Sequence, residues 1–444
     1  MTSYLISLLV LILTLAPVAD SGAEEAPARL TEKDAIHLAL RQHPAVKEYK
    51  ERMASAQEQI GVSRAAYLPQ LSFTSNLYYG NSFPATSGAG TVGGPPGLGG
   101  GGLKTTDYYI NRFSASQLIY DFGKTPGLIA QSRSTFNQSR EDYAATRQRV
   151  VLDARTAYFG YLAAQRAVKV TEETVRQNQE LVRQAEGFYQ VGLKAKIDVT
   201  KAEANLYDAE SNLIKVKNAV ELARVSLMNA LGLKTWTFKE VEDVLEVAPK
   251  PYSLEDLKSQ ALRQRPEILK NRFQQEYSQA ALRVARAGWL PTVSSLAAYG
   301  WSGPEHPFST TTWESRSWWV GGGLTFPFFD GLLSYHNMRS ASANIRAAEA
   351  NAEVLSQDVS KEVDQSFLDL KTSWELIRAT KKALEAAREN FRLAQGRYRV
   401  GVGSIIEVTD AQVQYFQSDL RHVQALYDYR VNEAKLEKAV GKAF

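Results

Sequence analysis

The sequence predicts an α+β membrane protein made of two copies of one plan, in which a pair of strands precedes a pair of long helices. Three observations support this class. Short motifs recur at constant spacings, four segments have the composition and length of a membrane-crossing strand, and proline-free heptad patterns follow each strand pair. With 444 residues, the chain is also longer than one compact core usually organises. We therefore expect a repeated, elongated architecture.

The N-terminus has the pattern of a secretory signal peptide. An apolar run from Leu5 to Leu15 is too short to span a bilayer comfortably and is followed by small residues, although no Lys or Arg precedes it. We expect residues 1–23 to be a signal peptide, and a buried N-terminal helix is the alternative. No later stretch approaches roughly 18 consecutive apolar residues, so the mature chain is expected to meet a membrane with strands only.

The rest of the chain contains an internal repeat. The motif Ala39-Leu-Arg-Gln-His-Pro44 recurs 222 positions later as Ala261-Leu-Arg-Gln-Arg-Pro266, and Tyr189-Gln-Val-Gly192 recurs 209 positions later as Tyr398-Arg-Val-Gly401. The shorter second spacing means that the first copy carries extra residues, which we assign to the Gly/Pro/Ser/Thr tract 84–104, a surface loop. The predicted organisation is a first repeat at 24–232, an inter-repeat linker at 233–252 and a second repeat at 253–444.

Each repeat is expected to begin with two helices and two strands. The first helix, at 31–42 or 254–264, stops before a proline, because the residue that precedes proline disfavours the helical conformation. A second helix then runs to Pro69 or Pro291. Strand composition follows at 70–79, 108–120, 292–301 and 317–328. Tyr and Trp gather toward the loop ends of these segments, which is typical of a membrane-interface girdle, although a soluble sheet with an aromatic core would have a similar composition.

A pair of long helices is expected after each strand pair. No proline occurs after Pro126 until the chain has passed Tyr189, and apolar or small residues recur in steps of three and four, the pattern of a coiled-coil seam. A helix of this length would span roughly 100 Å, which exceeds the width of a globular core. The four predicted seams include Val150, Ala154, Tyr161, Val175 and Ala185; Leu206, Leu213, Val220 and Leu227; Val359, Val363, Leu370, Ile377 and Phe391; and Tyr415, Ala425, Tyr429 and Leu436.

Composition excludes several functional classes. The formal charge of +4 is spread along the chain, which does not suggest nucleic-acid binding, and the absence of cysteine excludes disulfides, thiolate metal sites and thiol nucleophiles. The five histidines show no metal-ligand spacing, so no metal or other cofactor is expected. A GxGxxG match at Gly88–Gly93 lies in the Pro/Gly tract, where no helix can begin, so it does not predict a dinucleotide site. The sequence does not predict an enzyme.

Four strands cannot close a membrane barrel. An open sheet edge in hydrocarbon leaves unpaired peptide groups that each cost several kcal/mol, so strands from several copies must join. Closure needs at least about eight strands. Two chains are therefore the lower bound, and three chains would give twelve strands.

The helix-turn segments resemble a known family. Phe188-Tyr-Gln-Val-Gly-Leu-Lys-Ala-Lys-Ile-Asp-Val199 and Arg397-Tyr-Arg-Val-Gly-Val-Gly-Ser-Ile-Ile-Glu-Val408 resemble the duplicated motif of TolC-type outer-membrane efflux proteins. This resemblance implies a homotrimer in outer-membrane lipid, with a 12-stranded β-barrel continued by a periplasmic 12-helix tunnel. It also implies an exit duct of a tripartite efflux pump or type I secretion system for small molecules, metal ions or polypeptides. The expected partners are a periplasmic adaptor and an inner-membrane pump of RND, ABC or MFS type. A periplasmic coiled-coil adaptor or structural protein is the alternative.

The resemblance also assigns candidate site residues at the two turns. The adaptor-docking tips would be Val191, Gly192 and Leu193 in the first copy, and Val400 and Gly401 in the second. Asp198 and Tyr398 match positions that link neighbouring helices and hold the tunnel closed. The family's frequent arginine partner falls at Gly403, so Arg399 or Lys196 is expected to substitute for it.

Two carboxylates complete the candidate site. Glu407 and Asp410 are three residues apart and therefore share a helix face. By resemblance they form an acidic ring in the tunnel lumen, where three-fold symmetry would gather six carboxylates and favour cations. A solvated helix surface is the alternative interpretation, since exposed carboxylates are common.

Overall fold

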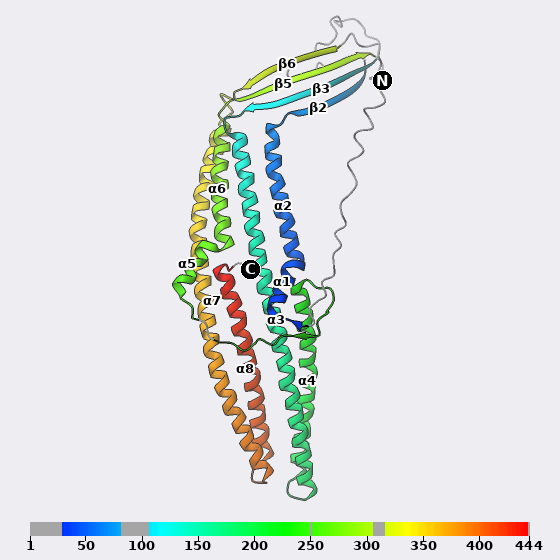
Figure 1. Cartoon of the computed structure of the whole chain (residues 1–444), viewed down its shortest axis with the longest axis vertical. Helices are drawn as coiled ribbons and strands as arrows, with labels where there is room; N and C mark the ends of the chain where they lie inside the picture. Colours follow the sequence, from blue (N-terminus) through cyan, green and yellow to red (C-terminus); the bar gives the residue numbers. More distant parts are fainter. Residues whose placement is uncertain (1–28, 81–105, 249–250, 305–315, 443–444) are drawn as a thin grey trace.

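The chain forms an elongated bundle of long helices with a β-sheet at one end (Figure 1). This computed structural model describes residues 29–80, 106–248, 251–304 and 316–442. The expected signal peptide at 1–23 and the Gly/Pro-rich loop at 84–104 lie outside the described residues. In chain order the elements are β1 (Arg29–Leu30), α1 (Glu32–Gln42), α2 (Pro44–Arg64), η1 (Ala65–Tyr67), β2 (Gln70–Gly80), β3 (Thr106–Tyr120), α3 (Lys124–Gln190), α4 (Lys196–Leu231), β4 (Glu240–Val241), α5 (Leu254–Gln264), α6 (Pro266–Ala287), β5 (Thr292–Pro304), β6 (Arg316–Thr325), α7 (Leu333–Arg399) and α8 (Ile405–Val440).

The helices of the two halves correspond in order and length. Helices α3 and α7 each have 67 residues, α4 and α8 each have 36, and α1 and α5 each have 11. Helix α1 begins with a capping box, in which the Thr31 side chain accepts from the Asp34 N–H and Asp34 binds the Thr31 N–H in return. Pro44 and Pro266 are the first residues of α2 and α6, where their missing N–H and fixed φ favour helix entry.

The predicted heptad seams pack the long helices in pairs. In α7, Val359, Val363, Leu370, Ile377 and Phe391 are buried as the pattern predicts. In α4, by contrast, apolar side chains outside the predicted seam are largely exposed in the single chain. They are Tyr207 at 67%, Ile214 at 72%, Leu222 at 60% and Val225 at 59%. The seam therefore accounts for the contacts within each hairpin. Helix α4 has a second apolar stripe, which is exposed in the single chain.

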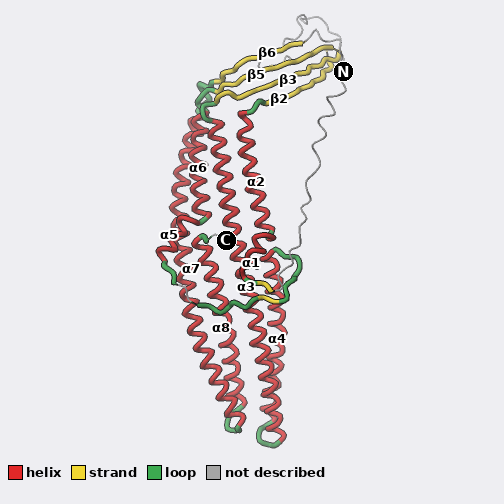
Figure 2. The backbone as a smooth tube through the Cα atoms, in the orientation of Figure 1, coloured by secondary structure: helices red, strands yellow, loops and turns green. Residues whose placement is uncertain are grey.

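The sheet is antiparallel with the strand order β2-β3-β5-β6, so β2 and β6 are its two open edges. It lies beyond the ends of α2, α3, α6 and α7, and no helix layer of the described residues covers either face (Figure 2). Strand β6 ends at Thr325, earlier than the predicted end at 328, because Pro327 lacks the N–H that a central ladder needs.

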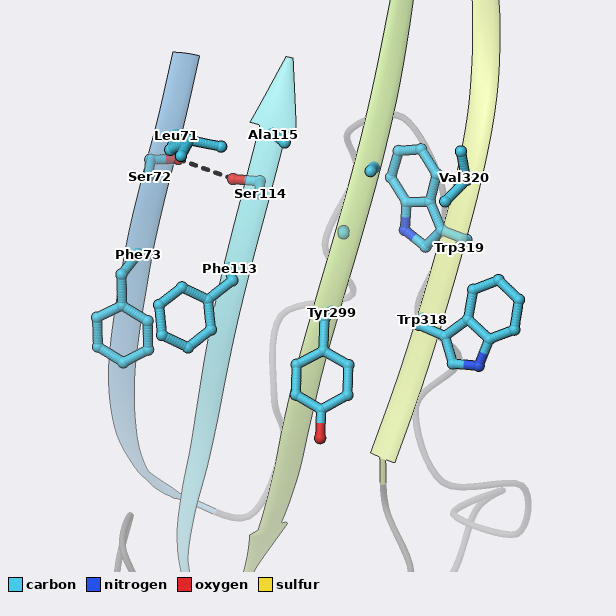
Figure 3. Close-up of a pocket in the computed structure, with 12 residues that line it drawn as sticks. Leu71, Ser72, Phe73, Phe113, Ser114, Ala115, Tyr299, Trp318, Trp319 and Val320 are labelled. Atoms are coloured by element: carbon cyan, nitrogen blue, oxygen red, sulfur yellow. Dashed lines mark hydrogen bonds between the residues drawn. The ribbon is translucent and has the colours of Figure 1, made fainter. Parts of the chain in front are cut away.

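One face of the sheet is apolar and exposed. Directly paired residues share a face, and the register aligns Phe73, Phe113, Tyr299 and Trp318 in one row across all four strands. Figure 3 shows this row beside the next one, which contains Leu71, Ala115 and Val320, and the two rows border a groove of about 590 Å³. Trp318 is 75% exposed and Val320 is 73% exposed.

The opposite face of the sheet is more polar, although the register also places Leu296 and Trp319 on it. There Ser72 and Ser114 share a hydrogen bond, with 2.8 Å between their Oγ atoms, and the neighbouring positions include Thr74 and Arg112. In a soluble sheet with an aromatic core, the aromatic face would be buried against another layer and the polar face would be exposed.

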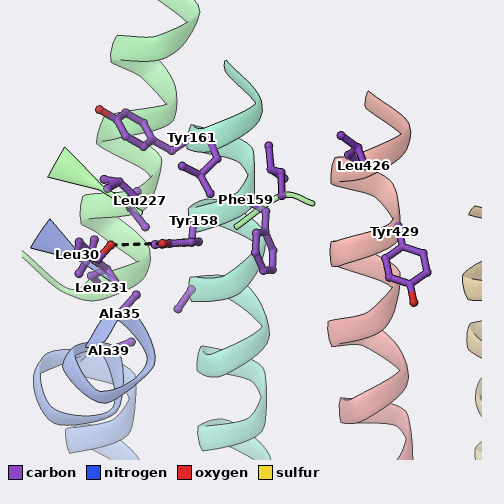
Figure 4. Close-up of a cluster of buried hydrophobic side chains, with 14 of the residues drawn as sticks. Leu30, Ala35, Ala39, Tyr158, Phe159, Tyr161, Leu227, Leu231, Leu426 and Tyr429 are labelled. Carbon is purple, nitrogen blue, oxygen red and sulfur yellow. Dashed lines mark hydrogen bonds between the residues drawn. The ribbon is translucent and has the colours of Figure 1, made fainter. Parts of the chain in front are cut away.

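The hydrophobic core lies at the waist of the bundle. It joins Leu30 and α1 to α3, α4 and α8 through fully buried side chains, among them Tyr158, Phe159 and Leu231 (Figure 4). The Tyr158 hydroxyl donates to the carbonyl oxygens of Glu242, at 2.7 Å, and of Leu30, at 3.3 Å. These contacts fix the parallel pair of short strands β1 and β4 against α3.

The segment between the two repeats crosses the waist as a belt, which we define as residues 236–248. Arg166 of α3 donates to both carboxylate oxygens of Asp243, at 2.8 and 2.9 Å. Arg430 of α8 donates to the backbone carbonyl oxygens of Val244 and Glu246. The belt therefore ties the α3/α4 hairpin to the α7/α8 hairpin.

Candidate functional site: the turn end of the long helices

The two long hairpins end side by side at the pole opposite the sheet (Figure 1). Each turn has a glycine in the left-handed region, Gly192 at φ +73° and Gly401 at φ +84°. The Leu193 N–H donates to the Phe188 carbonyl at 2.9 Å, and the Val402 N–H donates to the Arg397 carbonyl at 3.1 Å. These bonds reverse the chain without leaving the last helix carbonyls unpaired.

The turns present apolar side chains to solvent. Val191 and Leu193 are each 68% exposed in the first turn, and Val400 and Val402 are 71% and 69% exposed in the second. Contiguous exposed apolar residues on a soluble surface usually mark a contact site. Val402 belongs to this surface and was missed by the sequence analysis, although it stands beside Gly401 in the quoted motif.

A small hydrophobic cluster holds the two turns together. Tyr398 is fully buried there, with its ring 5.6 Å from that of Phe188. Burial, followed by the nearby Asp198 carboxylate, raises the pKa of Tyr398 to about 12. The structure thus brings Asp198 and Tyr398 near each other, while the Tyr398 hydroxyl has no hydrogen-bond partner among the described residues.

The acidic pair lies at the start of α8. Glu407 and Asp410 are both exposed. The Glu407 N–H donates to Ser404 Oγ at 3.2 Å, and the Glu407 carboxylate Oε1 lies 3.0 Å from Nε of Arg397. Arg397 was not selected from the sequence, although its spacing of ten positions from Glu407 across a helical turn allows the contact.

Gly403, where the resemblance leads us to expect an arginine, is contacted by a lysine of the other hairpin. The Lys194 ammonium donates to the Gly403 carbonyl at 3.0 Å and lies 5.6 Å from the centroid of the Tyr398 ring. Lys196 and Arg399, which the sequence analysis proposed as substitutes, are exposed and form no ion pair with other described residues. The internal repeat could have predicted this contact region, because Lys194 and Gly403 are 209 positions apart and therefore occupy equivalent positions in the two turns.

Comparisons with known proteins decide the family. A model described as "Outer membrane efflux protein" matches residues 35–233 and 257–442, which is most of the chain. The chain belongs to the outer membrane efflux protein family. "Outer membrane protein TolC" of Escherichia coli (strain K12) is 25% identical over 405 residues, covering 87% of this chain and 77% of that protein. "Probable efflux pump outer membrane protein TtgC" of Pseudomonas putida is 25% identical over 327 residues, covering 72% and 66%.

The fold agrees with this assignment. The crystal structure of the CmeC outer membrane channel of Campylobacter jejuni superposes with a TM-score of 0.78 at 20% identity, covering 92% of this chain and 85% of that one. As an outer membrane efflux protein, the chain is an outer-membrane channel protein with a long helical periplasmic extension, and it is not an enzyme. Within the described ranges, no helix is long and apolar enough to cross a bilayer. No cluster of three or more His, Cys, Asp or Glu in those ranges could hold a metal ion.

Proposed function

We propose that three copies of this outer membrane efflux protein form an exit duct, with a 12-stranded β-barrel in the membrane and a 12-helix tunnel in the periplasm. The duct serves a tripartite efflux pump or a type I secretion system, and it passes small molecules, metal ions or polypeptides without chemistry. One observation carries the proposal. The four-stranded sheet has two open edges and an uncovered apolar face, and only pairing of β2 with β6 of another copy removes both edges in lipid.

The exposed stripe of α4 supports the same assembly. Tyr207, Ile214 and Val225 are 59 to 72% exposed in the single chain and repeat along one helix. In a helical tunnel each hairpin has a neighbour on both sides, so such a stripe is buried against the adjacent copy. The strand pairs, which a coiled-coil adaptor would not place before each helix pair, favour the duct over the adaptor alternative.

The exposed tips are the proposed docking site for a periplasmic adaptor, which in turn recruits an inner-membrane pump of RND, ABC or MFS type. The two turns form an apolar surface at the pole opposite the sheet, made of Val191, Gly192, Leu193, Val400 and Gly401. Asp198 and Tyr398 are proposed to help hold this end closed. The Pseudomonas putida relative is a "probable efflux pump outer membrane protein", which supports a partnership with a pump.

The assembly is tested with introduced cysteines, because the chain has none of its own. Cysteine pairs are scanned with one member on β2 and the other on β6, and the oxidised protein is separated by size. We expect crosslinked dimers and trimers, with nothing larger, together with single-channel conductance in planar lipid bilayers. Crosslinks confined to single chains, or a soluble particle without conductance, would reject the duct.

The acidic pair is tested in the same bilayers. If Glu407 and Asp410 form a lumen ring, replacing both with alanine removes six carboxylates from the trimer and weakens block by multivalent cations. The matched control replaces Glu173 and Glu180, which are exposed on α3 and paired with arginines. Unchanged block in the Glu407/Asp410 variant would remove both residues from the constriction.

The cargo is tested separately from the duct. A deletion strain is challenged with drugs and metals and is assayed for secreted proteins. We expect loss of one class of export, and complementation by the wild-type chain identifies it.

A further inference from the structure

A cleft of about 800 Å³ lies at the waist, between the α3/α4 hairpin and the belt. Its walls come from Tyr161 to Glu172 of α3, from Lys217 to Glu221 of α4 and from Trp236 to Asp243 of the belt. This volume suits a small organic ligand and is far larger than a single ion needs. None of the exposed stripe residues of α4 lines the cleft, so an assembly that buries the stripe does not have to cover it.

One wall of the cleft is a fixed aromatic surface. The Trp236 ring lies 5.6 Å from the Tyr161 ring and packs edge-on against Phe238, with 5.3 Å between their centroids. Phe238 is buried, whereas Trp236 is half-buried and lines the cleft. Gln165 Nε2 donates to the Tyr161 hydroxyl at 3.0 Å, which orients the second ring. The indole is therefore held in place by its neighbours while part of its surface stays open to the cleft.

The charged groups of the cleft leave a surplus of cations. Lys169 of α3 and Lys239 of the belt are exposed and form no ion pair with the rest of the described chain. Glu240 is the one carboxylate of the described lining without an ion pair. The other lining carboxylates are paired: Asp243 with Arg166, Glu172 with Lys217, and Glu221 with Arg224. Two free ammonium groups against one free carboxylate favour an anionic ligand.

The lining groups together match a sugar that carries a carboxylate. Sugar C–H groups pack on the electron-rich face of an aromatic ring such as Trp236, and sugar hydroxyls exchange hydrogen bonds with amides such as Asn218. A carboxylate on the sugar pairs with the free ammonium groups. A purely apolar ligand would instead desolvate the charged rim without compensation. A nucleotide would lack the helix N-terminus that commonly holds phosphates, because α3 and α4 line the cleft with residues far from their starts.

We propose that the waist cleft binds an acidic glycan, with a sugar ring on Trp236 and its carboxylates on Lys169 and Lys239. The position of the cleft selects the source of the glycan. The cleft lies roughly 70 Å along α3 from Lys124, at the sheet end of this helix. This depth places it in the periplasm, among the N-acetylated sugars, lactyl carboxylates and acidic peptides of the cell wall. The acidic sugars of outer-membrane glycolipids share this chemistry but face the exterior. A glycan bound here attaches the protein to the cell wall at its waist, which is an activity separate from transport.

The site is tested by isothermal titration calorimetry of the purified protein in detergent, with a soluble disaccharide tetrapeptide of the cell wall as the probe. The variant Lys169→Gln/Lys239→Gln removes both free cations. The control, Lys215→Gln/Lys234→Gln, removes two exposed lysines outside the lining. We expect the dissociation constant to rise about tenfold in the first variant, which corresponds to about 1.4 kcal/mol, and to stay at the wild-type value in the control. No binding to the wild-type protein, or equal affinities for the two double variants, would overturn the proposal.

The class of ligand is tested with three further probes. They are an uncharged N-acetylglucosamine trisaccharide, the deacylated core oligosaccharide of an outer-membrane glycolipid, and a nucleoside diphosphate. Each is expected to bind more weakly than the disaccharide tetrapeptide, because each lacks either the carboxylates or the N-acetylated sugars. Tighter binding of any of the three would overturn the assignment to a cell-wall glycan.

Tryptophan fluorescence tests the stacking. The chain contains seven tryptophans, so quenching by the disaccharide tetrapeptide is compared between the wild type and Trp236→Phe, which keeps an aromatic ring at the waist. We expect the quenching to be lost in Trp236→Phe, with an unchanged far-UV circular dichroism spectrum, and equal quenching in both proteins contradicts the stacking. Single-channel conductance should stay at the wild-type value in Lys169→Gln/Lys239→Gln. A protein that binds the glycan but forms no channels rejects the duct alone, whereas normal channels without glycan binding reject the cleft alone.

Discussion

Replacing Arg155 with methionine should destabilise the waist strongly. The Arg155 side chain is only 7% exposed and is shared by three helices. Its Nε lies 2.7 Å from Oε1 of Glu32 on α1, its Nη1 donates to Glu437 on α8, and its guanidinium lies 5.9 Å from the centroid of the Phe159 ring. Methionine keeps most of the side-chain volume and removes the charge. The loss in free energy of unfolding therefore measures the contribution of the ion cluster and not the effect of a cavity.

The expected loss of stability in Arg155→Met follows from the carboxylates of Glu32 and Glu437, which lose their shared cation. Breaking a buried ion pair by removing one partner costs about 3–5 kcal/mol, because the other charge is left uncompensated. Glu437 keeps an ion pair with Lys442 at 2.6 Å, so we expect the lower end, about 3 kcal/mol. The control is Arg176→Met on the same helix. Arg176 is 68% exposed and pairs with Glu173 one turn away, and such a pair contributes about 0.3–0.5 kcal/mol.

The assay is denaturant unfolding of the purified protein in detergent, followed by far-UV circular dichroism. Arg155→Met should lower the free energy of unfolding per chain several times more than Arg176→Met, at an unchanged denaturant slope. Equal midpoints for the two variants would refute the argument that the buried cluster stabilises the waist.

The sign of the pH dependence of the Arg155→Met destabilisation follows from the pKa of Glu437. Burial disfavours the charged form of Glu437, but the hydrogen bond from Lys442 and the charge of Arg155 together outweigh it and hold the pKa below its ordinary value of 4.5. A lowered pKa contributes stability that is fully present above about pH 4.5 and is lost as the pH falls through the folded-state value. The penalty of Arg155→Met should therefore be largest near neutral pH and should shrink in acid. A penalty that grows on acidification would contradict the assignment.

Three further predictions concern the sheet, the belt and the second turn. Val320→Arg, on the exposed apolar face, should cost about 2–4 kcal/mol in lipid, whereas Ser114→Arg, on the polar face, should cost much less; folding yield in vesicles measures both. Tyr158→Phe removes the hydroxyl that binds the belt and should lower the free energy of unfolding by about 1–1.5 kcal/mol, measured by denaturant unfolding. Gly403→Ala should destabilise by about 1–3 kcal/mol, whereas Gly396→Ala, where a Cβ meets nothing within 4 Å in a helix, should stabilise by up to about 1 kcal/mol; a comparison of their thermal melting temperatures tests the pair.

Local rules made most of the helices predictable from sequence. The prolines at 44 and 266 fix where α1 and α5 end, and the glycines at 192 and 401 fix where α3 and α7 stop. Most of the heptad seam of α7 is predictable, because apolar residues spaced three and four apart line one face of a helix; Val359, Val363, Leu370, Ile377 and Phe391 are buried there. The belt contacts of Arg166 and Arg430 could not be predicted in this way, since they join residues far apart in sequence through backbone and side-chain geometry.

The repeat predicts positions better than it predicts chemistry. A Cβ at Gly232 would lie 2.8 Å from the Cα of His43, and a Cβ at Gly441 would lie 3.1 Å from the Cα of Arg265. Thus the same close approach occurs once in each half. At the shared position, however, His43 caps α2 by accepting from Ala45, while Arg265 binds carboxylates of α6 and α7. Duplication therefore preserved the backbone contact, and the polar partners diverged.

The two ends of the long hairpins differ in what holds them together. At the waist, α3 and α8 share the buried Arg155–Glu437 pair and both bind the belt through arginines. At the turns, the hairpins share a small apolar cluster and the contact from Lys194 to Gly403. Separating them at the waist exposes buried charges, whereas separating them at the turns breaks one half-exposed hydrogen bond and uncovers a few side chains. Any relative motion of the hairpins should therefore pivot at the waist and be largest at the turns.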